Sequence, residues 1–258
     1  MSNIKRAFDH GKAFIPFITC GDPSLAVTEE IVQRMALAGA DLIELGIPFS
    51  DPTAEGPVIQ AASNRALTAG ATTDKIFDMV VRLRETVKIP MVFMTYANVL
   101  FSYGSERFIK KCSEIGIDGL IIPDVPFEEK EEFAPYCEKY GVDLVSMIAP
   151  TSGDRIREIA SKAQGFLYCV SSMGVTGTRS EIVTDIGAMI ESVRAASNIP
   201  AAIGFGISDA AQAKKMAAYA DGVIMGSAIV KLCEKYGSEA PEHIERLVRE
   251  VKAAITEL

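Results

Sequence analysis

Two acidic side chains in the first quarter of the chain are placed for proton transfer. Glu44 lies in the apolar run LIELG, residues 42–46, and Glu55 lies in the segment that follows. If this run is a strand, Leu42 and Glu44 point to the same face. A carboxyl group buried on that face loses hydration, which raises its pKa and allows it to act as acid and base near neutral pH. A structural carboxylate paired with an interior cation is the alternative, but no Arg or Lys ends any apolar run.

The segment after this run is long and stiff for a turn. Three prolines restrict the backbone of residues 46–57, which also carry Asp51 and Glu55. A solvated surface loop is the simpler interpretation. A rigid acidic loop directly above an inward-pointing Glu44 is better explained as part of the same site.

Two glycine-containing segments later in the chain fit an anion site. The sequence GFGIS occupies residues 204–208 and MGSA occupies residues 225–228, and both follow apolar runs. Glycines in such positions also simply permit tight turns. Backbone N–H groups and a helix N-terminus at these turns are suited to phosphate, which predicts a phosphate site there. Residues 171–178, with two glycines and several hydroxyls, fit either a closing flap or an ordinary loop.

Several kinds of chemistry lack the residues that they need. His10 and His243 lie outside every apolar run, and no cluster of residues has metal-ligand spacing. No Ser–His or Cys–His pair is evident, and no lysine is placed to form a Schiff base. The sequence therefore predicts a reaction without metal or cofactor, on a phosphorylated substrate between apolar walls. The candidate wall residues are Phe17, Tyr96, Tyr168 and Phe205.

A repeated pattern of helical stretch, short turn and apolar run must position these residues. The helix-like stretches include residues 29–38, 75–87, 128–140, 182–196 and 243–255. Four of the turns carry an Asp within two residues before the run, namely Asp41, Asp118, Asp143 and Asp221. The apolar runs are residues 14–19, 42–46, 91–93, 120–121, 144–145, 166–170, 201–203 and 223–224.

Short continuous apolar runs are typical of parallel strands that are buried on both faces. Eight strands alternating with helices predict an α/β protein, a (β/α)8 TIM barrel with extra helices, in which residues 1–258 form a single domain. A doubly wound open sheet is the alternative. In the barrel, the active site lies at the C-terminal ends of the strands, where Glu44 and both glycine turns fall.

Composition excludes other classes of protein. The 258 residues carry a net charge of -8 without a basic block, so neither nucleic acid nor an anionic membrane is an expected partner. No signal peptide and no apolar run near the roughly 18 residues of a membrane span are evident. The 5 cysteines are scattered and lack CxxC spacing, which fits reduced thiols and a cytoplasmic location.

At this point the motifs resemble those of tryptophan synthase α subunits over essentially the whole chain. The longest and most specific match runs from Glu44 to Pro57. The matching segments, in order, are residues 14–19, 21–23, 44–52, 56–57, 59–60, 94–98, 123–126, 174–177, 204–208 and 226–230.

The resemblance implies a retro-aldol cleavage of indole-3-glycerol phosphate to indole and glyceraldehyde 3-phosphate. Glu44 matches the glutamate that carries protons between the substrate hydroxyl and indole C3, and Glu55 matches the carboxylate that accepts the indole N–H. Thr176 matches a flap threonine that closes onto that carboxylate. The residues matching those around the indole and the catalytic acid are Phe17, Tyr96, Asp124 and Tyr168. The residues assigned to phosphate are Gly177, Gly206, Gly226 and Ser227.

The resemblance also implies a partner, a pyridoxal-phosphate β subunit that receives indole within an α2β2 heterotetramer. The pyridoxal phosphate is expected only on that partner. The docking residues expected on this chain are Asp51, Pro52, Asn98 and Pro126. Many family members carry Asp where this chain has Glu55, and Ser172 and Met173 differ from the enterobacterial pair.

Three other functions remain as alternatives. Another phosphate-binding barrel, such as an indole-glycerol-phosphate synthase or a sugar-phosphate isomerase, is the nearest. A synthase needs a catalytic lysine at a strand end, which is missing. A free-standing indole-releasing lyase and a nearly inactive regulatory subunit are the others, and the retained Glu44 and Glu55 argue against the last.

Overall fold

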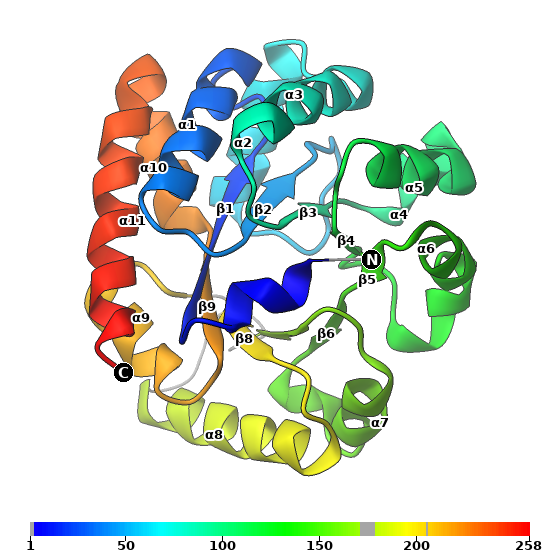
Figure 1. The fold of residues 1–258 in the computed structure, drawn as a ribbon, viewed down its shortest axis with the longest axis vertical. Coiled ribbons are helices and arrows are strands. Elements are labelled where there is room, and N and C mark those ends of the chain that lie inside the picture. The colour runs from blue at the N-terminus through cyan, green and yellow to red at the C-terminus, as the bar shows by residue number, and fades with distance from the viewer. Residues whose placement is uncertain (1–2, 171–178, 205) are drawn as a thin grey trace.

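A ring of parallel strands forms the centre of the molecule (Figure 1). The structure is a computed structural model that describes residues 3–170, 179–204 and 206–258. The strands are β1 (Ala13–Thr19), β2 (Ile43–Gly46), β3 (Met91–Met94), β4 (Gly119–Ile121), β5 (Asp143–Leu144), β6 (Ser146–Ile148), β7 (Leu167–Val170), β8 (Ala201–Gly204) and β9 (Gly222–Met225). Their order is β5-β4-β3-β2-β1-β9-β8-β7-β6, and every pair is parallel.

The two end strands of this order, β5 and β6, are separated only by Val145. The backbone N–H of Val145 donates to the carbonyl of Leu120 at 2.9 Å, so this residue continues the contact with β4. β5 and β6 therefore act as one interrupted strand that closes the sheet into an eight-stranded barrel. The (β/α)8 prediction is confirmed, and the open-sheet alternative is wrong.

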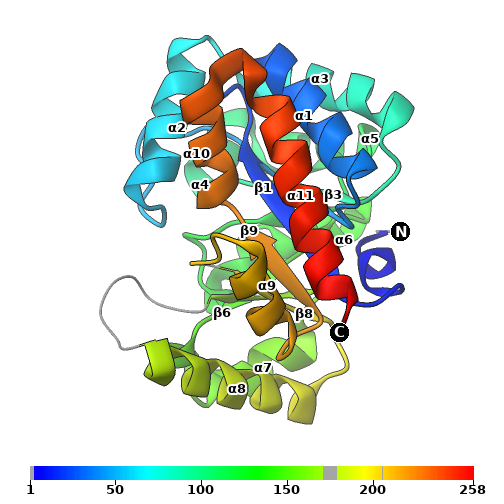
Figure 2. The same ribbon diagram turned by 90° about the vertical axis from the view of Figure 1, so that its left-hand side faces the viewer.

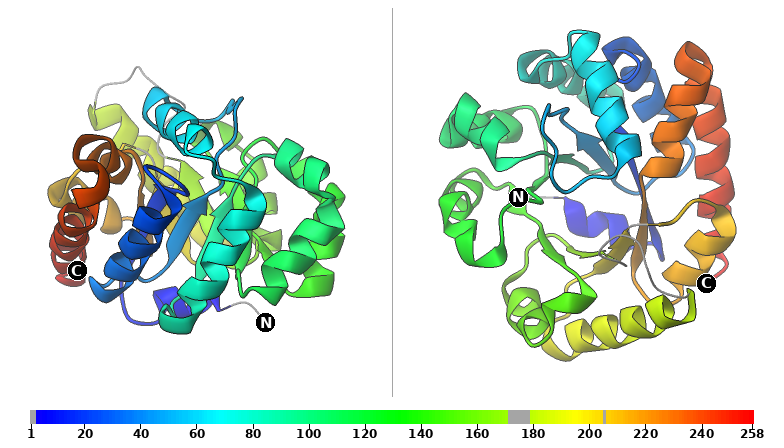
Figure 3. Two further views of the ribbon diagram at one scale, coloured as in Figure 1. Left: turned by 90° about the horizontal axis from the view of Figure 1, so that it is seen from above. Right: turned by 180° about the vertical axis from the view of Figure 1, so that it is seen from behind.

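Helices surround the barrel on its outer face (Figures 2 and 3). The α-helices are α1 (Leu25–Leu37), α2 (Pro57–Thr68), α3 (Thr73–Thr86), α4 (Ala97–Tyr103), α5 (Ser105–Glu114), α6 (Ala134–Tyr140), α7 (Arg155–Lys162), α8 (Arg179–Ala196), α9 (Ala210–Ala217), α10 (Ser227–Tyr236) and α11 (Ala240–Thr256). Short 3-10 helices are η1 (Ile4–Phe8), η2 (Phe127–Glu132), η3 (Pro150–Ser152) and η4 (Gly237–Glu239). Within the described ranges, none of the helices is long and apolar enough to cross a membrane.

Local sequence sets where several helices begin. The side chains of Ser24, Thr72 and Asp209 accept backbone N–H groups in the first turns of α1, α3 and α9. Such caps satisfy donors that lack a partner within the helix. The helix expected at residues 128–140 is instead divided at Phe133 into η2 and α6. Pro135 accounts for the division, because proline lacks an N–H and favours the first turn of a new helix.

The core has an inner layer inside the barrel and an outer layer between strands and helices. Buried side chains of the inner layer include Ile15, Leu42, Val92, Phe166 and Ile224. The outer layer takes the alternate residues of the same strands, such as Phe14, Ile43 and Phe93. Leu42 therefore points inward, which the alternation alone had left open. Glu44 shares its face.

The N-terminal end of the barrel is closed by η1, which lies across it in Figure 1. Ile4 and Ala7 of η1 are buried in the inner layer. Three of the turn aspartates accept a backbone N–H at the start of a neighbouring strand. These bonds join Asp41 to Phe14 at 2.7 Å, Asp118 to Met91 at 3.1 Å and Asp221 to Ala201 at 2.9 Å. The Asp that recurs in the sequence thus anchors the beginning of a neighbouring strand through a side-chain hydrogen bond.

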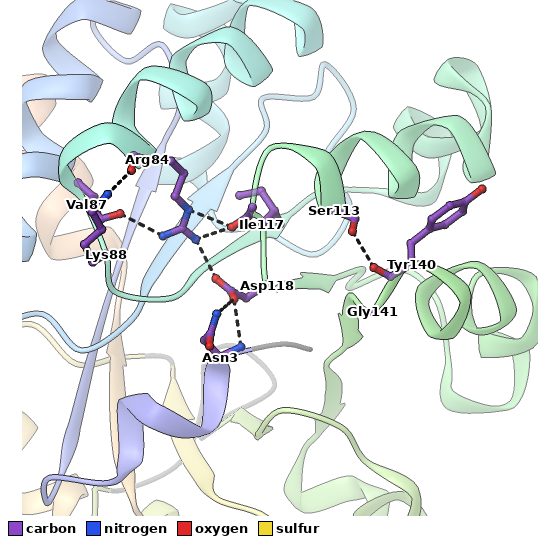
Figure 4. Close-up of a pocket in the computed structure, with 10 residues that line it drawn as sticks. Asn3, Arg84, Val87, Lys88, Ser113, Ile117, Asp118, Tyr140 and Gly141 are labelled. Atoms are coloured by element: carbon purple, nitrogen blue, oxygen red, sulfur yellow. Dashed lines mark hydrogen bonds and ion pairs between the residues drawn. The ribbon is translucent and has the colours of Figure 1, made fainter.

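Asp118 joins this end of the barrel to the chain terminus (Figure 4). Its Oδ1 accepts two N–H groups of Asn3, at 3.1 and 3.2 Å, and its Oδ2 accepts from the Arg84 guanidinium at 2.8 Å. A cavity of about 310 Å³ lies beside these groups. The hydrogen bonds of Asp118 hold η1, β3 and α3 together, at the end of the barrel opposite Glu44.

Candidate active site

The C-terminal ends of β1 and β2 bring two predicted residues together. Phe17 and Glu44 are partners in the parallel register of these strands. On the other side, Glu44 is the partner of Val92 in β3, whose side chain lies in the inner layer. Figure 3, at right, looks onto this end of the barrel, where the loop before α2 lies.

Glu44 is a buried carboxyl group that forms no ion pair within the described part of the chain. It is 1% exposed, and its Oε2 has no hydrogen-bond partner among the residues that the structure describes. Burial, and secondarily the charge of Glu55, raise the pKa of Glu44 to about 8. The carboxyl group is therefore mostly neutral at pH 7, ready to give a proton to a substrate. The structural-carboxylate alternative would need a paired cation, which the described residues do not supply.

Glu55 is the second acidic group of this site. It is partly exposed, and burial raises its pKa to about 7. Because its charge raises the pKa of Glu44, the two carboxyl groups lie within electrostatic reach of each other. Two carboxyl groups whose pKa values are pushed apart can take different protonation states at one pH.

Tyr96 holds the loop that carries Glu55. Its hydroxyl accepts the backbone N–H of Ala54 at 3.1 Å, and its ring lies 5.2 Å from that of Phe49. Tyr96 is 2% exposed, and burial together with the charges of Glu55 and Asp124 raises its pKa to about 12. The hydroxyl stays protonated at neutral pH and can donate its own proton to a neighbouring acceptor.

Asp124 lies near this tyrosine from the loop after β4. Its carboxylate accepts the backbone N–H of Ala97, at 3.0 Å to Oδ1 and 3.3 Å to Oδ2. Ala97 is the first residue of α4, so a negative charge lies at the N-terminus of that helix. Asp124 thereby fixes the direction of α4 and adds a third carboxylate to the rim.

Two glycines make room for the aromatic walls. A Cβ added to Gly46 would lie 2.6 Å from the ring of Phe17, and one added to Gly204 would lie 2.6 Å from the hydroxyl of Tyr168. Both rings therefore cover backbone that has no side chain. Tyr168 is 7% exposed, and burial and the nearby Glu44 raise its pKa well above the ordinary value. Sequence reasoning did not identify Gly46 as part of these walls, although a glycine that ends a buried strand is a usable signal.

The two predicted phosphate turns lie after neighbouring strands. β8 and β9 pair directly, and Gly206 and Gly226 follow their ends. Gly206 has φ +77°, in the left-handed region, with no atom within 4 Å of an added Cβ. Gly226 precedes the N-terminus of α10, whose first residue is Ser227. An open turn beside a helix N-terminus presents free N–H groups of the kind that bind phosphate.

The residues expected to contact a partner gather on one rim. Asp51, Asn98 and Pro126 are exposed and Pro52 is partly exposed, and they follow the adjacent strands β2, β3 and β4. Phe101, on the same helix as Asn98, is 51% exposed, although its ring packs 5.3 Å from that of Phe133. A single exposed apolar side chain is common on protein surfaces, so Phe101 is of interest here because it lies beside the residues expected to dock. The sequence did not single it out, because exposure depends on the fold.

Three residues of the sequence-based site lie outside the described residues, namely Thr176, Gly177 and Phe205. Among the residues that are described, no group of three or more His, Cys, Asp or Glu side chains could hold a metal ion. What the geometry provides is a buried neutral carboxyl group, a second carboxylate, aromatic walls and an anion turn. This set suits acid–base cleavage of a phosphorylated aromatic substrate.

Comparison with known proteins gives a consistent result over the full chain. A family model described as tryptophan synthase alpha chain matches residues 4–257. The tryptophan synthase alpha chain of Lacticaseibacillus casei is 47% identical over 255 residues, covering 99% of this chain and 96% of the relative. That of Alkaliphilus metalliredigens is 49% identical over 236 residues, covering 92% and 88%.

Solved structures agree with the sequence relatives. The tryptophan synthase subunit alpha of Legionella pneumophila superposes with a TM-score of 0.91 at 33% identity, with 100% of both chains covered. A chain of the tryptophan synthase complex from Pyrococcus furiosus superposes with a TM-score of 0.86 at 30% identity, covering 95% of this chain and 99% of that one.

Proposed function

The chain belongs to the tryptophan synthase alpha chain family, and from this premise we propose that Glu44 and Glu55 carry out its reaction. The chain is a lyase of tryptophan biosynthesis that cleaves indole-3-glycerol phosphate to indole and glyceraldehyde 3-phosphate. The observation that carries the assignment of Glu44 is its burial without a cation, which keeps a proton on it at neutral pH.

The first step is protonation of the indole ring. Neutral Glu44 gives its proton to C3, and the N1 lone pair supplies the electrons, so that positive charge develops on the ring nitrogen. Ionised Glu55 accepts the N1–H hydrogen bond, which strengthens as that charge grows. An interaction that is strongest in the transition state raises turnover rather than affinity.

The second step breaks the C3–C3′ bond. The bond electrons return to the ring and regenerate neutral indole, while the C3′ hydroxyl becomes the aldehyde of glyceraldehyde 3-phosphate. Glu44, now a carboxylate, takes the hydroxyl proton and is restored to its neutral form. The proton balance closes within one residue, so this mechanism uses no metal or cofactor.

The remaining residues would bind the two ends of the substrate. We assign Phe17, Tyr96, Tyr168 and Asp124 to the indole side, in agreement with the positions of the aromatic rings against Gly46 and Gly204. Gly206, Gly226 and Ser227 would receive the phosphate at the N-terminus of α10. Thr176 and Gly177 would complete the site as parts of the flap.

We further propose a tryptophan synthase β subunit as the partner, in an α2β2 heterotetramer in which the β subunit carries pyridoxal phosphate and receives the indole. The rim with Asp51, Pro52, Asn98 and Pro126 would contact it. The five cysteines are free and buried, which fits a complex in the reducing cytoplasm. The chain from the Pyrococcus furiosus complex, which this chain resembles, is consistent with such a partner.

Release of indole from indole-3-glycerol phosphate by the purified chain tests the catalytic assignment. Glu44→Gln removes the transferable proton, so turnover should fall by at least about 100-fold. Glu55→Gln should lower turnover by roughly 10- to 150-fold, the value of a hydrogen bond to a charged group. Both variants should still bind glycerol 3-phosphate in titration calorimetry.

The matched control is Glu85→Gln, because Glu85 is an exposed carboxylate on α3, away from the barrel mouth. It should keep near-normal turnover. A Glu44→Gln protein that is folded and within a few-fold of the unaltered chain would exclude Glu44 as the proton carrier.

A further inference from the structure

The backbone on both sides of Glu55 is held by side chains from two different elements. On one side, the N–H of Ala54 donates to the hydroxyl of Tyr96 at 3.1 Å. On the other, Nε2 of Gln60 donates to the carbonyl oxygen of Glu55 at 2.7 Å. The backbone around Glu55 is therefore held by the side chains of Tyr96 and Gln60.

Helix geometry places Gln60 for this contact. Gly56 is the N-cap of α2 and has no side chain to cap the first turn, and the N–H groups of Ile59 and Gln60 both donate to its carbonyl at 3.1 Å. Side chains of a helix lean toward its N-terminus. Gln60, at the end of the first turn, therefore reaches back to the peptide that precedes the N-cap.

The helix that carries Gln60 is itself firmly attached to the barrel. Ile59 and Ala62 of α2 are buried against Phe17. One turn further on, Arg65 forms two hydrogen bonds of 2.8 Å to Asp22, a carboxylate that is 1% exposed. A contact from Gln60 thus ties Glu55 to a helix that is anchored on the barrel, although Gln60 itself is exposed.

We infer that Gln60 is a positioning residue for the Glu55 carboxylate. The inference rests on the proposed role of Glu55. A glutamate side chain has three rotatable bonds, and any rotation of its backbone adds to the range of positions that the carboxylate takes. Removing one of the two backbone contacts lets the peptide rotate and spreads the carboxylate over several positions. Small losses of alignment in a reacting complex reduce turnover more than ground-state binding.

The test is a double-mutant cycle on indole release. Gln60→Ala should lower kcat by about 3- to 10-fold, the value of one net hydrogen bond, with KM for indole-3-glycerol phosphate changed less than about 2-fold. In the Glu55→Gln background, Gln60→Ala should lower kcat by less than about 2-fold, because no carboxylate remains to be positioned. Thermal unfolding of Gln60→Ala should match that of the unaltered chain.

The matched control is Asn64→Ala. Asn64 is exposed one turn beyond Gln60 on the same helix, and its side chain makes no hydrogen bond within the described ranges. It should change kcat less than 2-fold in either background.

The outcomes separate this inference from the proposed function. Normal turnover of Glu55→Gln would overturn the role of Glu55 itself. If Glu55→Gln is impaired but Gln60→Ala is not, or if the two losses multiply, only the positioning role is overturned. A reduced kcat for Gln60→Ala that disappears in the Glu55→Gln background supports it.

Discussion

At the scale of single residues, the feature that organises the site is a carboxyl group kept neutral by its surroundings. Burying a charge without a partner is costly, so Glu44 retains a proton instead of ionising. The same burial makes that proton available to an indole ring that enters the barrel. Glu55 lies nearer to solvent and has the lower pKa, so it is the group that ionises first. The difference in burial therefore makes Glu44 the acid and Glu55 the anion, although both are glutamates.

These pKa values predict a bell-shaped pH dependence of kcat/KM. The active form has neutral Glu44 and ionised Glu55. Activity should fall as pH drops below about 7, where Glu55 gains a proton, and as pH rises above about 8, where Glu44 loses one. The optimum therefore lies between these two values. Initial rates of indole release across the neutral range would measure both limbs.

Glu55→Gln provides the internal control for this profile. The acid limb should disappear from the residual activity, because no group at position 55 then titrates. The alkaline limb should persist and move to lower pH, since the charge of Glu55 no longer raises the pKa of Glu44. If the fall in activity at low pH persists in Glu55→Gln, a group other than Glu55 causes it.

At the scale of secondary-structure elements, the sequence predicted the eight strand positions of the barrel, but not β6, which continues the fifth position beyond the expected run of residues 144–145. Continuous apolar runs mark strands buried on both faces, and helices alternate with them, so the barrel follows from pattern alone. Alternation also put Glu44 on the same face as Leu42, and the structure shows that Leu42 lies in the inner layer and that Glu44 is buried. The break at Phe133 was missed, although Pro135 is a usable signal for the first turn of a new helix.

The parts of the site that the sequence did not predict depend on the path of loops. The contact between Tyr96 and Ala54 joins the end of β3 to the loop after β2, and no spacing in the sequence encodes it. The bond from Gln60 to Glu55 is local, but it requires α2 to begin at Pro57. The role of Asp118 required knowledge of which strand starts beside it.

The hydrogen bonds of Asp118 to Asn3, Arg84 and Met91, here called the Asp118 clamp, give a prediction about stability. Asp118→Ala removes the acceptor for Met91, Asn3 and Arg84 at once, and leaves a partly buried guanidinium without its anion. Loss of one partner of such a pair should lower the free energy of unfolding by about 3 kcal/mol. Urea denaturation measures the change, and kcat/KM of the folded protein should stay within about 2-fold because the clamp is remote from Glu44.

Asp154→Ala is the comparison for this variant. Asp154 is exposed before α7, and its side chain makes no capping hydrogen bond there. Its substitution should change the free energy of unfolding by less than about 0.5 kcal/mol. Equal stability of the two variants would show that the clamp adds little to the fold.

At the scale of the whole molecule, the two ends of the barrel have different tasks. The N-terminal end holds η1 and the aspartates that fix strand starts. The C-terminal end carries the buried carboxyl group, the loop with Glu55 and the anion turns. Because the stabilising contacts lie at the other end, the loops of the C-terminal end can be exposed without weakening the core. The proposed partner surface also lies at this end, next to the site of the reaction.

The proposed partner surface gives a prediction for binding. Phe101 is half exposed beside Asn98, and an aromatic ring that becomes buried in an interface often contributes a large share of the binding energy. Phe101→Asp should weaken the affinity for a β subunit by at least about 10-fold, equal to about 1.4 kcal/mol. Indole release by the chain alone should change little. Titration of the β subunit, followed by the rise in rate of this chain, measures the affinity.

Leu37→Asp distinguishes a specific surface from a general effect of added charge. Leu37 is 77% exposed at the end of α1, next to the N-terminal side of the barrel, so it lies away from the rim with Asn98. It introduces the same carboxylate in place of an exposed apolar side chain and should leave the affinity unchanged. If the β subunit favours a closed arrangement of the loops, a saturating amount still activates Phe101→Asp fully, at a higher concentration. Equal affinities for Phe101→Asp and Leu37→Asp would mean that the partner docks elsewhere on the barrel.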